Sequence, residues 1–127
     1  MAQLVDLQLN ISAAARAVLH RLSERDAPSS AFWRITTWAW YNCRERGVAL
    51  TVERYRVSRL VIVFGECRNS DEIFVDSWEG LPGDYSNGPK VEHLTDEAYE
   101  SRRMFPSVDK AAECVRKLIE KRVGQKL

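Results

Sequence analysis

The residues best suited to nucleophilic chemistry in this sequence are its three cysteines, Cys43, Cys67 and Cys114. A cysteine nucleophile needs a base within hydrogen-bond reach and usually a lowered thiol pKa. Cys67 is the best placed, because it stands beside Arg68, but only His20 and His93 are present to act as the base. Neither histidine belongs to a recognisable signature. A small cysteine-dependent enzyme is therefore the weakest functional hypothesis, and we expect no catalytic activity.

Metal-binding and nucleotide-binding patterns are equally weak. Glu92, His93 and Asp96 lie close together, but a single histidine beside acids lacks the repeated ligand spacing of zinc or calcium sites. The glycines within residues 80–88 do not match GxGxxG, the motif that cradles a dinucleotide phosphate. We therefore expect no metal and no cofactor.

Charge is distributed unevenly along the chain, although the formal net charge is only +1. Residues 66–100 hold ten acidic residues against two basic ones, whereas residues 1–65 and 101–127 carry net charges of +4 and +5. A dense acidic segment can steer a basic partner and fix its orientation. The alternative is a solvated acidic surface that the basic flanks neutralise on folding.

Nucleic-acid binding is a second functional alternative, because 14 of the 19 basic residues are arginines and several stand among aromatic residues. Such side chains can grip phosphates and stack on bases. The low net charge, the missing RNP-like motif and the acidic segment, which repels polyanions, count against it.

Apolar residues at helical spacing predict a first helix over residues 3–25, although alternation within residues 1–11 also fits a strand. A second helix is predicted over residues 30–46, because a serine can cap its start and Arg44–Gly47 resembles a helix C-terminus. Its aromatic residues indicate that it lies largely buried, and they are Phe32, Trp33, Trp38, Trp40 and Tyr41.

After the second helix the apolar period changes to two, which predicts strands over residues 48–55, 60–64 and 73–78. Residues 80–89 contain three glycines and two prolines and are expected to form a surface loop. A short fourth strand over residues 91–94 and a short helix over residues 96–103 follow. Ser107 then caps an amphipathic helix over residues 107–123, with Asp109 in its first turn.

These elements predict a single α+β domain over residues 1–127, with a three- or four-stranded antiparallel β-meander over about residues 48–95 packed against the helices. The longest apolar run, Leu60–Phe64, is far too short to span a bilayer, and no basic region precedes the first apolar residues. A cytoplasmic protein is expected. The predicted core residues are Trp40, Val61, Val63, Val75, Val115, Leu118 and Ile119.

Two short segments carry a resemblance to a known family. The segment FVDSWEG lies at a strand end over residues 74–80, and FPSVDKA opens the last helix over residues 105–111. With the order of the elements, they resemble the Imm-TriTu family of bacterial immunity proteins from polymorphic toxin systems, over residues 45–122. The resemblance implies a small cytosolic protein that binds a cognate toxin domain and blocks its active site or substrate channel. It carries over no catalytic residue.

A catalytically silent domain with a dense acidic segment fits an inhibitor of a basic, nucleic-acid-directed toxin, and a phage-type inhibitor of the anti-CRISPR kind has the same features. We therefore place the partner-binding surface on the acidic segment. Trp78 and Tyr85 are the predicted anchors. The predicted electrostatic contacts are Asp71, Glu72, Asp76, Glu79, Asp84 and Glu92.

Overall fold

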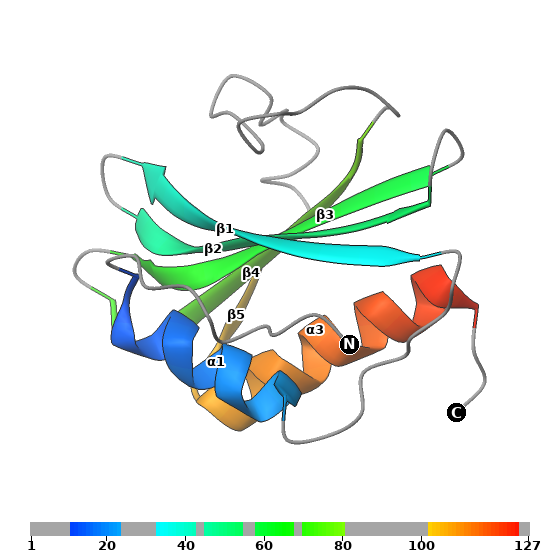
Figure 1. The fold of residues 1–127 in the computed structure, drawn as a ribbon. Coiled ribbons are helices and arrows are strands. Elements are labelled where there is room, and N and C mark those ends of the chain that lie inside the picture. Colours follow the sequence, from blue (N-terminus) through cyan, green and yellow to red (C-terminus); the bar gives the residue numbers. More distant parts are fainter. Residues whose placement is uncertain are drawn as a thin grey trace.

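A computed structural model describes residues 11–23, 33–42, 45–54, 58–67, 70–80 and 102–124. Its elements are α1 (Ala13–Ser23), β1 (Arg34–Asn42), β2 (Glu45–Arg54), β3 (Ser58–Cys67), β4 (Ile73–Gly80), β5 (Arg103–Phe105) and α3 (Val108–Val123). The strands form one antiparallel sheet in the order β1-β2-β3-β4-β5 (Figure 1). The α+β class is confirmed, with five strands where three or four were expected. Neither described helix is long and apolar enough to cross a membrane.

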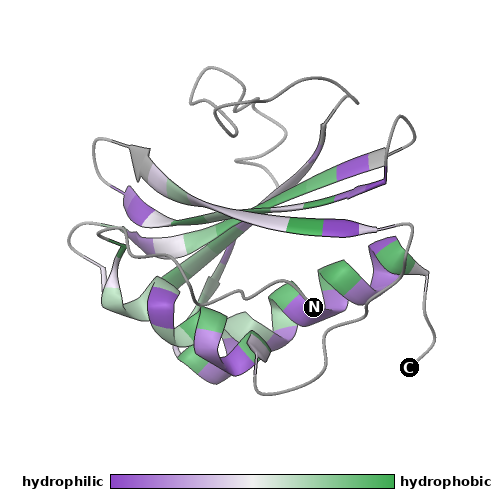
Figure 2. Ribbon diagram, in the orientation of Figure 1, coloured by the Kyte–Doolittle hydropathy of each residue, from purple (hydrophilic) through white to green (hydrophobic). Residues whose placement is uncertain are grey.

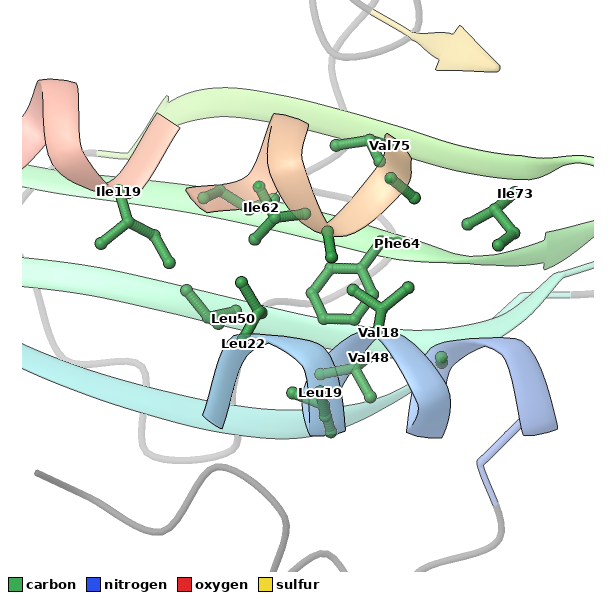
Figure 3. Packing of buried hydrophobic residues seen from close by; sticks show 14 of the residues in the cluster. Val18, Leu19, Leu22, Val48, Leu50, Ile62, Phe64, Ile73, Val75 and Ile119 are labelled. Atoms are coloured by element: carbon green, nitrogen blue, oxygen red, sulfur yellow. The ribbon is translucent and has the colours of Figure 1, made fainter. Parts of the chain in front are cut away.

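Both helices lie side by side on the same face of the sheet, below it in the view of Figure 1. We call this the first face. Val18 and Leu19 of α1 and Ile119 of α3 meet strand residues such as Leu50 and Phe64 there (Figure 3). All five are at most 1% exposed, so this face holds the main apolar core. Figure 2 shows the apolar residues of α3 on the side toward the sheet.

The opposite face of the sheet, called the second face, has a different composition. Within the described ranges no helix covers it. Its buried apolar cluster consists of Trp40, Ala49, Val61, Val63, Phe74 and Trp78. Side chains alternate between the two faces along each strand, so neighbours such as Ile62 and Val63, both fully buried, belong to different clusters.

The predicted burial of Val61, Val63, Val75, Trp40, Val115 and Ile119 is confirmed, and Leu118 is partly buried.

Two glycines face each other across β2 and β3, near the end of the ladder that holds Glu45 and Cys67. Gly47 of β2 pairs with Gly65 of β3, and Trp40 and Phe74 continue the same cross-strand row on either side. A Cβ added to Gly47 would stand 2.1 Å from the carbonyl oxygen of Phe64, which is backbone and cannot move aside. β2 and β3 therefore approach each other closely at Gly47 and Gly65. No side chain occupies these two positions between Trp40 and Phe74.

The prediction of a helix over residues 30–46 is wrong, because Arg34–Asn42 forms strand β1 and Glu45 begins β2. The segment holds β-branched Ile35, Thr36 and Thr37 beside two tryptophans, a composition that favours strands. Both sides of β1 carry apolar side chains, and this obscured the period of two. Gly47, interpreted as a helix end, is instead the partner of Gly65. The expectation that a helix over residues 30–46 packs against the sheet is therefore also wrong.

The other predicted elements fare better. The C-terminal helix is confirmed: the Ser107 side chain accepts a hydrogen bond from the Lys110 N–H, and Gly124 ends the helix in the left-handed conformation at φ 73°. The predicted strands correspond to β2, β3 and β4, each longer than expected. Of the predicted helix over residues 3–25, the structure describes residues 11–23, and α1 spans Ala13–Ser23. The strand over 91–94 and most of the helix over 96–103 lie outside the described residues, and Arg103 belongs to β5.

Candidate partner-binding site

The predicted acidic contacts Asp71 and Glu72 lie on the turn that joins β3 to β4. Both side chains are exposed, and neither forms an ion pair with another described residue. The turn is ordered by two hydrogen bonds, since the Ser70 N–H donates to the Cys67 carbonyl at 3.2 Å and the Glu72 N–H donates to the Ser70 hydroxyl at 3.1 Å. The backbone that carries these two exposed carboxylates is thus ordered at one end of the sheet.

An exposed apolar side chain lies beside this turn. Met104 of β5 is 39% exposed, and among the described residues it is the large hydrophobic side chain that stands out in this way. It pairs with Phe74, two residues after Glu72, so Met104 lies near the start of β4, where this turn ends. We call Asp71, Glu72 and Met104 the acidic corner. An apolar anchor beside unpaired charges is a composition found at protein interfaces.

Two predicted contacts, Asp76 and Trp78, are buried on the second face, at 1% and 7% exposure. Asp76 accepts two hydrogen bonds from Arg102, from Nε to Oδ1 at 2.8 Å and from Nη2 to Oδ2 at 2.7 Å. Trp78 packs in the apolar cluster of that face. In this structure Asp76 forms a buried ion pair with Arg102, and neither Asp76 nor Trp78 offers a free surface to a partner.

Arg102 bridges the row of the paired glycines. On one side it binds Asp76, and on the other its Nη2 lies 2.7 Å from Glu45 Oε1 and its Nη1 3.6 Å from Cys67 Sγ. Its guanidinium lies 4.4 Å from the centre of the Phe74 ring. Gly47 and Gly65 have no side chains that would fill the space between Asp76 and Glu45. The Arg102 guanidinium can therefore lie over these glycines and bind both carboxylates. One cation thus serves two buried carboxylates.

Burial has the largest single effect on the ionisation of this cluster. Burial, reinforced by the neighbouring Glu45 carboxylate, raises the pKa of Asp76 above its ordinary value, although the hydrogen bonds from Arg102 oppose the shift. The pKa of Arg102 is raised by its two carboxylate partners despite the opposing effect of burial, so it stays charged. The second oxygen of Glu45, Oε2, and the indole Nε1 of Trp40 are buried without a hydrogen-bond partner in the described structure.

A second ion cluster lies at the other end of the same face, and it has more arginines than carboxylates. The Glu53 carboxylate lies between Arg34, at 2.6 Å, and Arg59, at 2.8 Å. Burial alone would raise the pKa of Glu53, but hydrogen bonds from both arginines lower it below its ordinary value. Here two cations serve one carboxylate, and the carboxylate stays ionised.

The remaining predicted contacts do not join the acidic corner. Glu79 is exposed at the far end of β4, on the first face, and forms an ion pair with Arg122 of α3. Asp84, Tyr85 and Glu92 lie outside the described residues. The structure therefore brings Asp71 and Glu72 together and separates them from Asp76, Trp78 and Glu79.

The thiols have the ionisation of packed side chains. Burial raises the pKa of Cys67 and of Cys114 above the ordinary thiol value, so both are protonated at neutral pH. His20 is exposed on α1, while Cys43 and His93 lie outside the described residues. Within the described ranges, no group of three or more histidine, cysteine or acidic side chains is placed to hold a metal ion.

Sequence reasoning missed Arg102, Glu45 and Met104. Asp76 carried a usable signal, because a carboxylate on the same side of a strand as Phe74 and Trp78 requires a cation when buried. Fourteen arginines could have supplied that cation, and the pairing of β4 with β5 selects Arg102. Nothing in the sequence marked Met104 as an exposed hydrophobic residue.

These features define the class of architecture: a five-stranded antiparallel meander with two helices on one face and two ion clusters on the other. Comparison with family models, with curated proteins and with solved structures gave no match to this chain.

Proposed function

We propose that this chain is a non-catalytic, cytoplasmic binding protein of the immunity or inhibitor kind, which neutralises a cognate bacterial toxin by covering its active site or substrate surface. The observation that carries the proposal is the acidic corner. Its two carboxylates are exposed, unpaired within the described structure and held on a hydrogen-bonded turn, with Met104 beside them. A preordered contact surface loses little conformational entropy on binding.

The charged and thiol groups elsewhere in the described structure support the same proposal. Asp76, Glu45 and Glu53 are engaged by arginines, and both described thiols have raised pKa values. A general base or a nucleophile would need a group that is ionised, accessible and free of strong partners. Asp71 and Glu72 are accessible on an exposed turn, where they suit electrostatic contact with a basic surface.

The complementary partner is a protein domain with a basic patch, as expected of a toxin that acts on nucleic acid. Unpaired charges at the edge of an interface act mainly on the rate of association, while a packed apolar anchor acts mainly on dissociation. Asp71 and Glu72 are therefore expected to steer the partner, and Met104 to hold it.

The first test pairs this chain with the protein encoded by the gene directly upstream, where a cognate toxin is expected. Co-expression should protect a bacterial host from that protein, and the two chains should co-purify. The variant Asp71→Lys, Glu72→Lys should slow association roughly tenfold at low ionic strength, with the difference shrinking as salt is added. Met104→Ala should mainly speed dissociation.

A matched control changes the same charge elsewhere. Glu113→Lys, Glu120→Lys adds the same positive charge on α3, away from the acidic corner, and should leave the association rate within about twofold. Absence of both binding and protection would overturn the inhibitor function. Binding with an association rate that the corner variant leaves unchanged at low salt would instead move the interface to another surface.

A second function, nucleic-acid binding, is favoured by the outer side of α3. Lys110, Lys117 and Lys121 are exposed there, and their spacing of seven and four residues places them on one side of the helix. Glu113, three residues after Lys110 and four before Lys117, lies on the same side and is paired with Arg116, while Asp109 is paired with Arg21. Salt-sensitive binding of a nucleic-acid duplex that Lys117→Glu, Lys121→Glu abolishes would establish this function.

A further inference from the structure

The two edges of the sheet differ in how they are protected. The β5 edge is three residues long, carries the exposed charge of Arg103 and contacts α3. The β1 edge is nine residues long, and its ladder with β2 runs from Arg34 to Asn42 without a bulge. No described strand pairs with the outer side of β1.

The β1 edge lacks the usual barriers against pairing with another strand. Its sequence, RITTWAWYN, contains no proline, glycine or lysine, and its one charge, on Arg34, is bound to Glu53 at the end of the strand. Short edges, lysines, prolines and bulges are the devices that normally prevent such pairing. The central residues Thr36, Thr37, Trp38 and Ala39 are all partly exposed, so solvent reaches this edge.

The backbone geometry shows which groups face outward from β1. A Cβ added to Gly65 would stand 2.7 Å from the Cα of Gly47, so the two Cα atoms are too close for a hydrogen-bonded pair, whose Cα atoms lie about 5.5 Å apart. Gly47 therefore bonds to Trp40 on its other side, and the pattern alternates along β1. The N–H and C=O groups of Ile35, Thr37 and Ala39 consequently point outward.

We propose that β1 pairs antiparallel with β1 of a second copy of this chain, which joins the two sheets across a two-fold axis. The register centred on Trp38 uses the whole edge and places Thr37 opposite the second copy's Ala39. Both residues have outward-pointing backbone groups, so they form a hydrogen-bonded pair. The arrangement also separates the two Arg34 side chains to opposite ends of the ladder, whereas a parallel arrangement would set them together.

This surface is independent of the proposed function. β1 and the acidic corner lie at opposite edges of the sheet, with β2 and β3 between them. A dimer through β1 leaves both acidic corners accessible. The occupant is a second copy because the edge complements itself in length, charge and hydrogen-bond pattern, and the interface needs no further component.

The test measures the mass of the full chain in solution over a range of concentrations, by sedimentation or by light scattering. We expect twice the monomer mass of 14.6 kDa at high concentration. Thr37→Pro removes an outward N–H that makes no bond within the sheet, and Thr37→Lys sets two like charges near the axis. Each should raise the dimer dissociation constant at least about tenfold while the circular dichroism of the monomer is retained.

Ser23→Lys is the matched control, because it adds the same charge at the exposed C-terminal end of α1 and should leave the dimer intact. Hydrogen exchange gives a readout without substitution. The Thr37 and Ala39 amides should become protected as concentration rises, while the exchange of core amides such as that of Ile62 stays the same. A monomer at every concentration, or a dimer that both Thr37 variants leave unchanged, would overturn the proposal.

Discussion

The two faces of the sheet are buried in different ways. The first face packs against α1 and α3 through aliphatic side chains and Phe64. The second face combines tryptophans and Phe74 with two ion clusters, of which one gives a single arginine to two carboxylates and the other gives two arginines to a single carboxylate. Each β strand contributes alternate residues to both environments.

This difference between the two faces predicts which substitutions the fold tolerates. An aliphatic core accepts conservative changes because its contacts are many and individually weak. A buried ion cluster depends on particular partners, because the removal of one leaves an uncompensated charge away from water. The second face is therefore expected to be the more sensitive of the two, residue for residue.

The largest effect is expected at Arg102. Arg102→Met leaves Asp76 and Glu45 buried without their cation and should lower the free energy of unfolding by about 3–5 kcal/mol in urea denaturation. Arg102→Lys keeps the charge but loses the paired hydrogen bonds, and should recover only part of this. If the arginine acts through charge balance, adding Asp76→Leu and Glu45→Leu to Arg102→Met restores most of the stability.

The neighbouring Arg103→Met is the control, because that side chain is exposed and the change should stay within about 0.5 kcal/mol of wild type. Equal costs at positions 102 and 103 would show that the cluster contributes nothing to folding.

A smaller effect is expected on the first face. Ile62 is fully buried between β3 and the helices, and Ile62→Val removes one methylene group without creating a charge (Figure 3). The loss should be about 0.5–1.5 kcal/mol in the same urea titration. If Ile62→Val lowers the free energy of unfolding as much as Arg102→Met does, the expected difference between the two faces is wrong.

The accuracy of the sequence-based predictions follows how local each signal is. The C-terminal helix was predicted well, because its serine cap, its apolar stripe and its terminal glycine all lie within the helix and its ends. β2, β3 and β4 were located from alternation and β-branched runs. β1 was misassigned because apolar side chains on both sides hid its alternation, and because a serine before it and Gly47 after it imitate helix ends.

The site was harder to predict than the fold, for a physical reason. The predicted contacts Asp71 and Glu72 are exposed, on a turn with a local hydrogen bond from the Glu72 N–H to the Ser70 hydroxyl. Whether Asp76 faces a partner or the protein interior depends on Arg102, which is 26 residues away in sequence and reaches it through the β4–β5 pairing. Contacts of that kind follow from the register of strands, which a single sequence does not specify.

The smallest effect, a pH dependence, separates the two ion clusters by sign. The pKa of Asp76 is raised from 3.8 by burial and by Glu45, against the hydrogen bonds from Arg102, so the folded state holds this proton more tightly than the unfolded chain does. Its contribution to stability therefore falls as pH rises from 3.8 to the raised pKa. Burial would also raise the pKa of Glu53, but hydrogen bonds from Arg34 and Arg59 lower it from 4.5, and its contribution is lost as pH falls below that value.

Urea titrations of wild type, Asp76→Asn and Glu53→Gln from about pH 3 to pH 7 test this directly. The stability difference between wild type and Asp76→Asn should shrink with rising pH, whereas the difference between wild type and Glu53→Gln should grow. Slopes of the same sign would mean that cation stoichiometry does not control these carboxylates. Opposite slopes are expected because burial outweighs the hydrogen bonds from the shared Arg102 at Asp76, while the hydrogen bonds from Arg34 and Arg59 outweigh burial at Glu53.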